Sequence, residues 1–447
     1  MTKTGEHIFQ DPYAKIGYKL HLLLHTGQLL MESGADTNRI ARDMTRAAAF
    51  MGIPEEKIHM HIMYTTLMLN ISDDDHSYTS FRKCRHHGVN MTVISAISKL
   101  SWRAMEEKYS LQMYEAELER IQKLEHHRHY SFYLSAIAAG LACGGFCKLF
   151  GSDWIAFFWT ALCACIAFSV RHFCNKMEIN PYAGISISAF TATMLAYFTH
   201  FFPGSATPWY PLIACTLFIV PGIPLINAID DLLNNYIVSG STRAINTLLI
   251  VSGMTFGIVL AIRLGNVPDF FTSLNIAPHS IYLSDAIAAA IASVGFSIIF
   301  NVPPRLLAAT AVGGIISIGL RNFCVIDLGM TQEIGAFVGA TAVSLLALKA
   351  VHWFHTPVHV ITIPSVIPMI PGVLLYRLLF AVLNIKNLDA AALMAGIQNG
   401  VEAILIIISI TVGATIPKIF ARRYIEKNKQ LHLEELLAKR SESETAH

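Results

Sequence analysis

The feature that most constrains this chain is a series of long apolar segments between residues 130 and 421. Each segment is about 20 residues long, and the short loops between them contain Pro, Gly, Asn or charged residues. A helix of about 20 apolar residues crosses the hydrocarbon core of a bilayer, which is roughly 30 Å thick. Only 14% of the residues are charged, against about 25% in soluble domains. The sequence therefore predicts an α-helical polytopic membrane protein.

The apolar segments fall into two groups of five. The expected spans are 131–150, 154–170, 183–202, 208–229 and 244–262 in the first group, and 281–300, 304–320, 333–351, 360–383 and 397–417 in the second. Because five is an odd number, the second group crosses the membrane in the opposite sense. We therefore expect about ten transmembrane helices arranged as two five-helix inverted repeats. The corresponding divisions of the chain are 130–265, 280–421 and a charged tail, 422–447.

The two groups also match each other in sequence at a shift of 150 positions. The matches are Phe146 with Phe296, Thr191 with Thr341, Arg171-x-Phe173-Cys174 with Arg321-x-Phe323-Cys324, and Pro221-Gly222 with Pro371-Gly372. Single apolar matches between two membrane segments arise by chance. The Arg-x-Phe-Cys and Pro-Gly matches at one shift favour a diverged duplication.

The Pro-Gly match marks a break in one apolar segment of each half. Proline removes a backbone donor and clashes with the preceding turn, so a helix is interrupted in both places. The residues concerned are Pro221, Gly222, Pro224, Pro371 and Gly372. At such a break the free N–H groups suit a carboxylate and the free carbonyls suit an ammonium. Paired breaks indicate a transport site, and we predict that Gly222 and Gly372 approach each other near the pseudo-twofold axis.

Six polar residues in or near the spans are further candidates for the substrate or ion pathway, because an ionisable group inside a bilayer is costly. They are Asn227, Asp230, Asp231, Asp285, Arg377 and Glu402. A solvated helix end is the alternative interpretation for Asp230 and Asp231. Arg377 could bind a substrate carboxylate, pair with Glu402 or extend to the membrane interface. Asp285 and Glu402 could be interfacial as well.

Residues 1–129 carry most of the charge and alternate between helix and strand periods. Helices are expected over 12–30, from Asp36 or Thr37 to Met51, and twice within 91–127, with strands over 58–71 and 76–83. This pattern predicts a small α+β domain that faces water and leads directly into the membrane. Two groups could bind a cation, namely Asp73-Asp74-Asp75 and His352 with His355 and His359. A solvated turn and an interfacial role are favoured for them, so neither a metal nor a cofactor is expected.

Two stretches of this domain resemble motifs of the threonine/serine exporter family. They are Gly27-x-Leu29-Leu30-Met31-Glu32-Ser33-Gly34-Ala35-Asp36-Thr37-x-Arg39-Ile40 and Val89-Asn90-x3-Ile94-Ser95-x-Ile97-Ser98. The motif residues that we single out are Ser33, Gly34, Asp36, Thr37, Arg39 and Asn90. The resemblance implies such a domain coupled to ten membrane spans. It also implies an inner-membrane exporter of small amino acids or, in split relatives, of dicarboxylates such as succinate.

The charged tail sets the predicted orientation. Its basic cluster, which favours the cytoplasmic side, consists of Lys418, Arg422, Arg423, Lys427 and Lys429. Charges in the short loops, Arg243 among them, discriminate poorly between the two sides. Ten spans place both termini on one side, so we expect both termini in the cytoplasm and the protein in the cytoplasmic (inner) membrane.

These features favour a secondary transporter that exports a small polar metabolite, driven by proton or ion exchange, over an enzyme. The chain contains no GxxxxGK[ST] motif for ATP binding. It also contains no GxSxG or HExxH motif, which weakens the alternative of a membrane-anchored hydrolase. A channel is a third alternative. The expected partners are a small-molecule substrate and the lipid bilayer; nucleic acid is not expected, and a homo-oligomer is left open.

Overall fold

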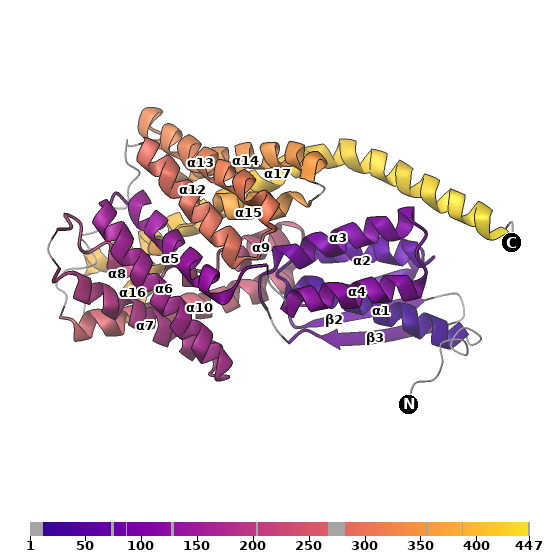
Figure 1. Ribbon diagram of the computed structural model, residues 1–447, viewed down its shortest axis with the longest axis horizontal. Coiled ribbons are helices and arrows are strands. Elements are labelled where there is room, and N and C mark those ends of the chain that lie inside the picture. The colour runs from indigo at the N-terminus through magenta and orange to yellow at the C-terminus, as the bar shows by residue number, and fades with distance from the viewer. Residues whose placement is uncertain are drawn as a thin grey trace.

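The structure is a computed structural model of the 447-residue chain. It describes residues 12–72, 76–85, 87–126, 129–202, 204–266, 282–354, 356–386 and 388–445. Among the candidate cation ligands, Asp73 to Asp75 and His355 lie outside these residues. Figure 1 shows a layer of helices and strands at the N-terminal end, joined to a larger body built of helices.

Four helices and a three-stranded sheet form the N-terminal unit, which we define as residues 12–126. They are α1 (Pro12–Glu32), α2 (Thr37–Phe50), β1 (Ile58–Ile62), β2 (Thr66–Ser72), β3 (Ser77–Lys83), α3 (Met91–Glu106) and α4 (Leu111–His126), with a short turn η1 (Glu55–Lys57). The strands are antiparallel in the order β1-β2-β3. The single strand predicted over 58–71 is instead two strands. Met63 and Thr66 exchange backbone hydrogen bonds of 3.0 and 3.3 Å and close a hairpin between them.

The remaining helices build the membrane region. They are α5 (Phe132–Leu149), α6 (Trp154–Lys176), α7 (Pro181–Thr199), α8 (Pro211–Ala214), α9 (Gly222–Leu233), α10 (Ile237–Leu264), α12 (Tyr282–Ile299), α13 (Leu307–Asn322), α14 (Gln332–Phe354), α15 (Val358–Val366), α16 (Gly372–Leu383) and α17 (Ala390–Thr445). Shorter turns are η2 (Leu217–Ile219), η3 (Pro304–Leu306), η4 (Phe323–Asp327) and η5 (Ile367–Met369). Polar side chains cap the N-termini of several helices. Ser131, Asp153 and Asn180 accept hydrogen bonds from the first turns of α5, α6 and α7.

Every predicted span coincides with a helix or a bent pair of helices. Among the described residues, six helices are long and apolar enough to cross a membrane, and two bent pairs raise the total to eight. The two other predicted spans are α7, which is 19 residues long, and α12, whose apolar part is Leu283–Ile299. The prediction of an α-helical polytopic membrane protein preceded by a small α+β unit is confirmed.

The contact between α5 and α12, the first helices of the two halves, is symmetric at the shift of 150. A Cβ atom on Gly145 would lie 2.8 Å from the carbonyl oxygen of Ala288, and one on Gly295 would lie 2.6 Å from that of Ala138. Only glycine permits this close approach. Residues 145 and 295, like 138 and 288, are 150 positions apart. The pseudo-twofold axis of the inverted repeat therefore passes between α5 and α12.

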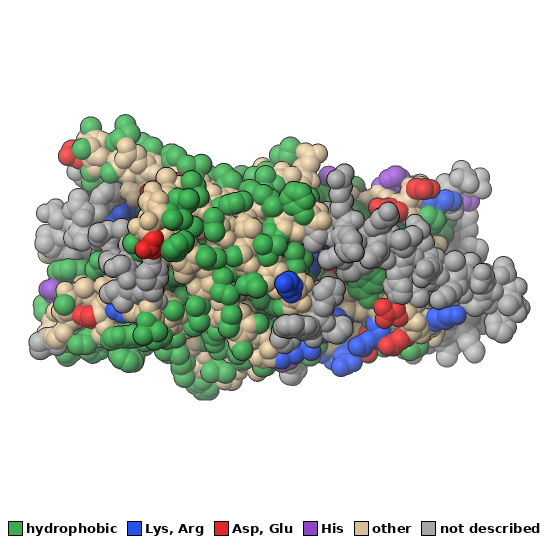
Figure 2. Space-filling model, turned by 90° about the horizontal axis from the view of Figure 1, so that it is seen from above, with side chains coloured by type: hydrophobic (Ala, Val, Ile, Leu, Met, Phe, Trp, Pro, Cys, Tyr) green, Lys and Arg blue, Asp and Glu red, His purple; other side chains and the backbone are tan. Residues whose placement is uncertain are grey.

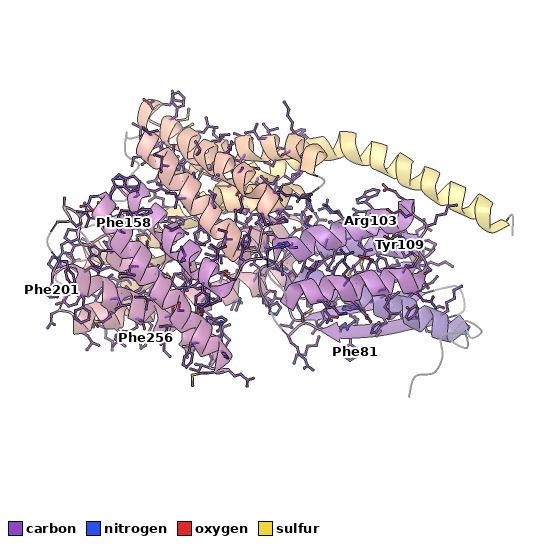
Figure 3. All side chains as sticks on the ribbon, in the orientation of Figure 1. Phe81, Arg103, Tyr109, Phe158, Phe201 and Phe256 are labelled. Atoms are coloured by element: carbon purple, nitrogen blue, oxygen red, sulfur yellow. The ribbon has the colours of Figure 1, made fainter. Side chains whose placement is uncertain are left out.

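The outer surface of the helical body is apolar, as a lipid-facing surface requires. Figure 2 shows hydrophobic side chains covering this body, with many of the visible charged side chains lying toward the N-terminal unit. Phe158, Phe201 and Phe256, labelled in Figure 3, are 67%, 65% and 58% exposed. The last helix, α17, runs on past this body to Thr445 (Figure 1) and takes in most of the predicted tail.

A buried histidine makes the stability of the N-terminal unit depend on pH. His25 is 6% exposed, and burial, together with the nearby Arg82 and His21, lowers its pKa to about 4. Between an unfolded pKa of about 6.5 and this folded value the unfolded chain binds more protons, so stability is full above pH 6.5 and is lost as the pH falls. We expect a loss of roughly 3 kcal/mol from this group, measured by unfolding at several pH values. His25→Leu should flatten that slope, and an unchanged slope would contradict the assignment.

Candidate functional site

The two Pro-Gly breaks have the same backbone structure. In the first half α8 and η2 meet α9 at a bend of 58°, and in the second half α15 and η5 meet α16 at a bend of 55°. Pro221 has φ −81° and ψ 65°, and Pro371 has φ −82° and ψ 58°. The N–H of Gly222 donates to Val220 and that of Gly372 to Ile370, both at 2.9 Å. The duplication predicted from the sequence thus extends to the geometry of the break.

The two breaks pack against each other. A Cβ atom on Gly222 would lie 2.6 Å from the side chain of Ile370, and one on Gly372 would lie 3.0 Å from that of Val220. A small cavity of about 10 Å³ lies between them, lined by Phe146, Leu217, Val220, Gly222, Phe296, Ile367, Ile370 and Gly372. The predicted approach of Gly222 and Gly372 is found. The cavity holds about one water molecule and not an amino acid, so the membrane region is closed at this level, and the role of the break in binding stays a prediction.

A second cluster forms where the N-terminal unit meets the membrane region. Its centre is the link between α1 and α2, residues Gly34 to Thr37, which we call the docking loop. Gly34 has φ +83°, and a Cβ atom there would lie 2.8 Å from the carbonyl oxygen of Gly88, so only glycine fits without strain. Asp36 caps α2 by accepting from the N–H of Arg39 at 2.8 Å, and it pairs with the Arg39 side chain at 3.3 Å. The carbonyl of Ser33 accepts from the N–H of Asn90 at 3.0 Å. These bonds hold the loop in one shape.

The docking loop bonds to the ends of α9 and α10. Thr37 donates its backbone N–H to one carboxylate oxygen of Asp231 and its hydroxyl to the other, both at 2.8 Å. Asn227 donates its side-chain amide to the carbonyl of Gly34 at 2.9 Å. Arg243 donates to the carbonyl of Ala35, also at 2.9 Å. The predicted pathway residues Asn227 and Asp231 are therefore brought together with the motif residues Gly34 and Thr37.

Asp231 and Arg243 form a buried ion pair. Arg243 Nε lies 2.9 Å from Asp231 Oδ2, and the two side chains are 3% and 0% exposed. The guanidinium also lies over the ring of Tyr64, 5.2 Å from its centroid. A buried pair is better tolerated when its members make further hydrogen bonds; here Asp231 accepts from Thr37 and Arg243 donates to Ala35. The solvated helix end considered for Asp231 is excluded by this burial.

Asp230 lies in an adjoining group of charges from α9, α15 and α17. It is 6% exposed and accepts from the hydroxyl of Thr415 at 3.1 Å. His359 Nε2 lies 3.7 Å from a carboxylate oxygen of Asp36, and Lys418 Nζ lies 3.0 Å from His359 Nδ1. Burial alone would raise the pKa of Asp36, but the charges of Arg39, His359 and Arg42 together outweigh it and hold the pKa of Asp36 well below its usual value.

A second contact joins the N-terminal unit to the other half of the membrane region. The side-chain oxygen of Asn90, the N-cap of α3, accepts from the side-chain amide of Asn301 at 2.9 Å. Met91 donates its N–H to the carbonyl of Phe300 at 2.9 Å, and Thr92 donates its hydroxyl to that of Asn301 at 2.6 Å. The N-terminal unit therefore bonds both to α9 and α10 and to the link between α12 and α13.

The other predicted pathway residues lie apart from both clusters. Asp285 is 5% exposed and accepts from the side-chain amide of Asn322 at 2.7 Å. Arg377 and Glu402 are partly buried and lie near enough to interact electrostatically. The structure thus does not gather these three residues with Asp230 and Asp231.

The docking loop, its partners on α9 and α10 and the adjoining charges around Asp230 together form what we call the docking cluster. Four of its residues were not predicted as site residues. Arg243 was taken for a loop charge, Lys418 for part of the basic tail, His359 for an interfacial residue, and Thr415 was not singled out. Arg243 is six positions inside α10, whereas the predicted span begins at residue 244 and left Arg243 in the preceding loop. Nothing local marks Thr415 and Lys418 as neighbours of Asp230 and His359.

Comparison with known proteins places the chain in a family. A profile described as "Putative threonine/serine exporter" matches residues 21–265, and one described as "Threonine/Serine exporter, ThrE" matches residues 285–420. Two relatives named "Probable succinate transporter subunit YjjP", from Escherichia coli (strain K12) and Klebsiella aerogenes, are each 26% identical over 244 residues, covering 54% of this chain and 93% and 92% of theirs. No solved structure matches. The chain belongs to the threonine/serine exporter family of membrane transporters.

Proposed function

We propose that this protein is a secondary carrier that exports a threonine/serine-type amino acid across the cytoplasmic membrane by alternating access, coupled to protons or another ion. The observation that carries the proposal is the pair of equivalent helix breaks, bent by 58° and 55°, that pack against each other at the interface of the two halves. In inverted-repeat carriers, sites lie at such breaks and the halves exchange conformations around them.

Alternating access follows from the symmetry of the break. In this structure the cavity between Gly222 and Gly372 is too small for an amino acid. If the bend of α9 and that of α16 change in opposite senses, the space between them opens to one side of the membrane and then to the other. The first N–H groups of α9 and α16 then face the substrate carboxylate, with the positive ends of the helix dipoles behind them. Such a site needs no charged side chain of its own.

We further propose the organisation expected from the sequence. Residues 1–129 form a cytoplasmic domain, 130–265 and 280–421 are the two membrane halves, and both termini are cytoplasmic. The two family profiles support the division between the two membrane halves, because they leave residues 266–284 between them. The basic residues at the end of the last span favour the orientation.

A dicarboxylate is the second candidate substrate. It is favoured by the name of the two relatives, which refers to succinate. The Asp231–Arg243 ion pair argues against it, because its two charges neutralise each other and leave no excess positive charge for a second carboxylate.

The two substrates are separated by flux into vesicles. Purified protein in proteoliposomes should carry labelled threonine and serine, with saturation and with competition by unlabelled threonine. Succinate should compete weakly. Alanine, which lacks the hydroxyl, should compete more strongly than succinate and more weakly than threonine. Saturable succinate flux without threonine flux would contradict the amino-acid proposal and leave the dicarboxylate one.

A further inference from the structure

We propose that the docking loop occupies a binding site for a zwitterionic β-hydroxy amino acid, with Thr37 in the place of the substrate. The inference rests on the proposed function, because it assigns to the threonine/serine-type substrate a second site, about two and a half turns along α9 from the break at Gly222. Its starting point is that the residue bonded to Asp231 is itself a threonine, held through its backbone N–H and its β-hydroxyl. Both side chains are fully buried.

The acceptor part of the site is the carboxylate of Asp231. It accepts from the nitrogen and from Oγ1 of Thr37 at 2.8 Å each, one oxygen for each donor. Free threonine has the same covalent connection between its nitrogen and its β-hydroxyl as the Thr37 residue. It can therefore offer its ammonium and its hydroxyl to the same two oxygens. An ammonium makes the first bond charge-assisted, so it is stronger than the bond of the Thr37 amide.

The donor part consists of Asn227 and Arg243. In this structure they donate to the carbonyls of Gly34 and Ala35 at 2.9 Å each. When the loop withdraws, both side chains lose these acceptors next to Asp231, and a buried donor without a partner is costly. A free amino acid is not tied to α2, so it can turn about Asp231 until its carboxylate meets these donors. An arginine and an amide are suited to binding a carboxylate.

The charge of the site selects a zwitterion. Asp231 and Arg243 form an ion pair at 2.9 Å and together carry no net charge. A zwitterion brings one positive and one negative group, so every charge in the site remains paired. Succinate brings two negative charges and no donor for Asp231, and it would bury uncompensated charge. The geometry therefore accounts for a preference for hydroxyl-bearing amino acids over dicarboxylates.

The loop and the substrate need the same groups, so they exclude each other. Substrate binding then requires the loop to leave α9 and α10, and the measured affinity is lowered by the fraction of molecules in which it is docked. In this arrangement the N-terminal unit closes one side of the membrane region, and a substrate molecule displaces it.

The first test is equilibrium binding of labelled threonine to the purified full-length protein. Thr37→Val keeps the shape of the loop and removes the hydroxyl bond to Asp231, so we expect the Kd for threonine to fall about tenfold. Thr37→Ser restores the hydroxyl and should return the Kd toward that of the unaltered protein. Thr242→Val is the matched control, because Thr242 is exposed and lies beside Arg243. Within the part of the chain that the structure describes, its hydroxyl donates only to the carbonyl of Val238, at 2.8 Å. Equal Kd values for all four proteins overturn the inference.

The second test needs no variant. 2-Aminobutyrate has the skeleton of threonine without its hydroxyl, so Asp231 Oδ2 loses the hydroxyl bond and keeps its contact with Arg243. A lost hydrogen bond to a charged group should weaken binding about tenfold or more. Equal binding of the two compounds overturns the inference. Flux measurements distinguish a failure of this inference from a failure of the proposed function. If the protein carries threonine but fails both binding tests, the inference alone is wrong; if it carries succinate and no amino acid, both are wrong.

Discussion

Replacing Gly222 with leucine is expected to reduce threonine flux about tenfold or more, while the protein still folds. Even a Cβ atom at this position would lie 2.6 Å from Ile370 and 2.7 Å from Ile367. A leucine side chain fills the space between the two breaks and prevents the bends from changing. Overpacking of this kind costs about 1–3 kcal/mol in stability, which a membrane domain of this size tolerates. Flux is measured in proteoliposomes, and folding by thermal unfolding of the purified protein.

The same change elsewhere provides the control. Gly319 lies in α13, and a Cβ atom there has no heavy atom within 4 Å outside its own helix turn, so Gly319→Leu should leave flux near its original level. By the symmetry of the repeat, Gly372→Leu should act like Gly222→Leu. Normal flux in both variants of the break would contradict the assignment of the transport site.

Replacing Arg243 with glutamine is expected to lower the free energy of unfolding by about 3–5 kcal/mol. The change leaves the carboxylate of Asp231, whose side chain is 0% exposed, buried without its counter-charge. The hydrogen bonds from Thr37 remain, but they do not neutralise it. Thermal or denaturant unfolding of the purified full-length protein measures the loss.

An exposed ion pair gives the comparison. Arg120 lies 3.2 Å from Glu117 with side chains that are 70% and 29% exposed, so Arg120→Gln should cost less than about 1 kcal/mol. Adding Asp231→Asn to Arg243→Gln should recover much of the lost stability, because no charge is then left buried alone. If the single and double variants were equally unstable, the loss would come from packing and not from charge.

The breaks and the repeat could be predicted because their signals are local or strictly periodic. Proline and glycine interrupt a helix wherever they stand, and a duplication leaves Pro221-Gly222 and Pro371-Gly372 at one fixed shift. Apolar length alone then located the ten segments. The hairpin at Met63 was missed because residues 58–71 form one continuous strand-like stretch and the turn between its two strands lacks glycine and proline.

The docking cluster could not be predicted because its members are distant in sequence. Thr37 and Asp231 are 194 positions apart, and Gly34 and Asn227 are 193 apart. The resemblance to the family marked the docking loop, and the cost of buried charge marked Asp231, but no periodicity links one to the other. The role of Arg243 followed only from its position beside Asp231.

The most direct measurement of the central claim is counterflow. Proteoliposomes loaded with unlabelled threonine should take up labelled threonine faster than empty vesicles and transiently accumulate it above the external concentration, because a carrier returns more quickly when it is loaded. Gly222→Leu should abolish this acceleration, and Gly319→Leu should retain it. Uptake that is independent of internal threonine and rises linearly with external threonine would describe a channel and contradict alternating access around the paired breaks.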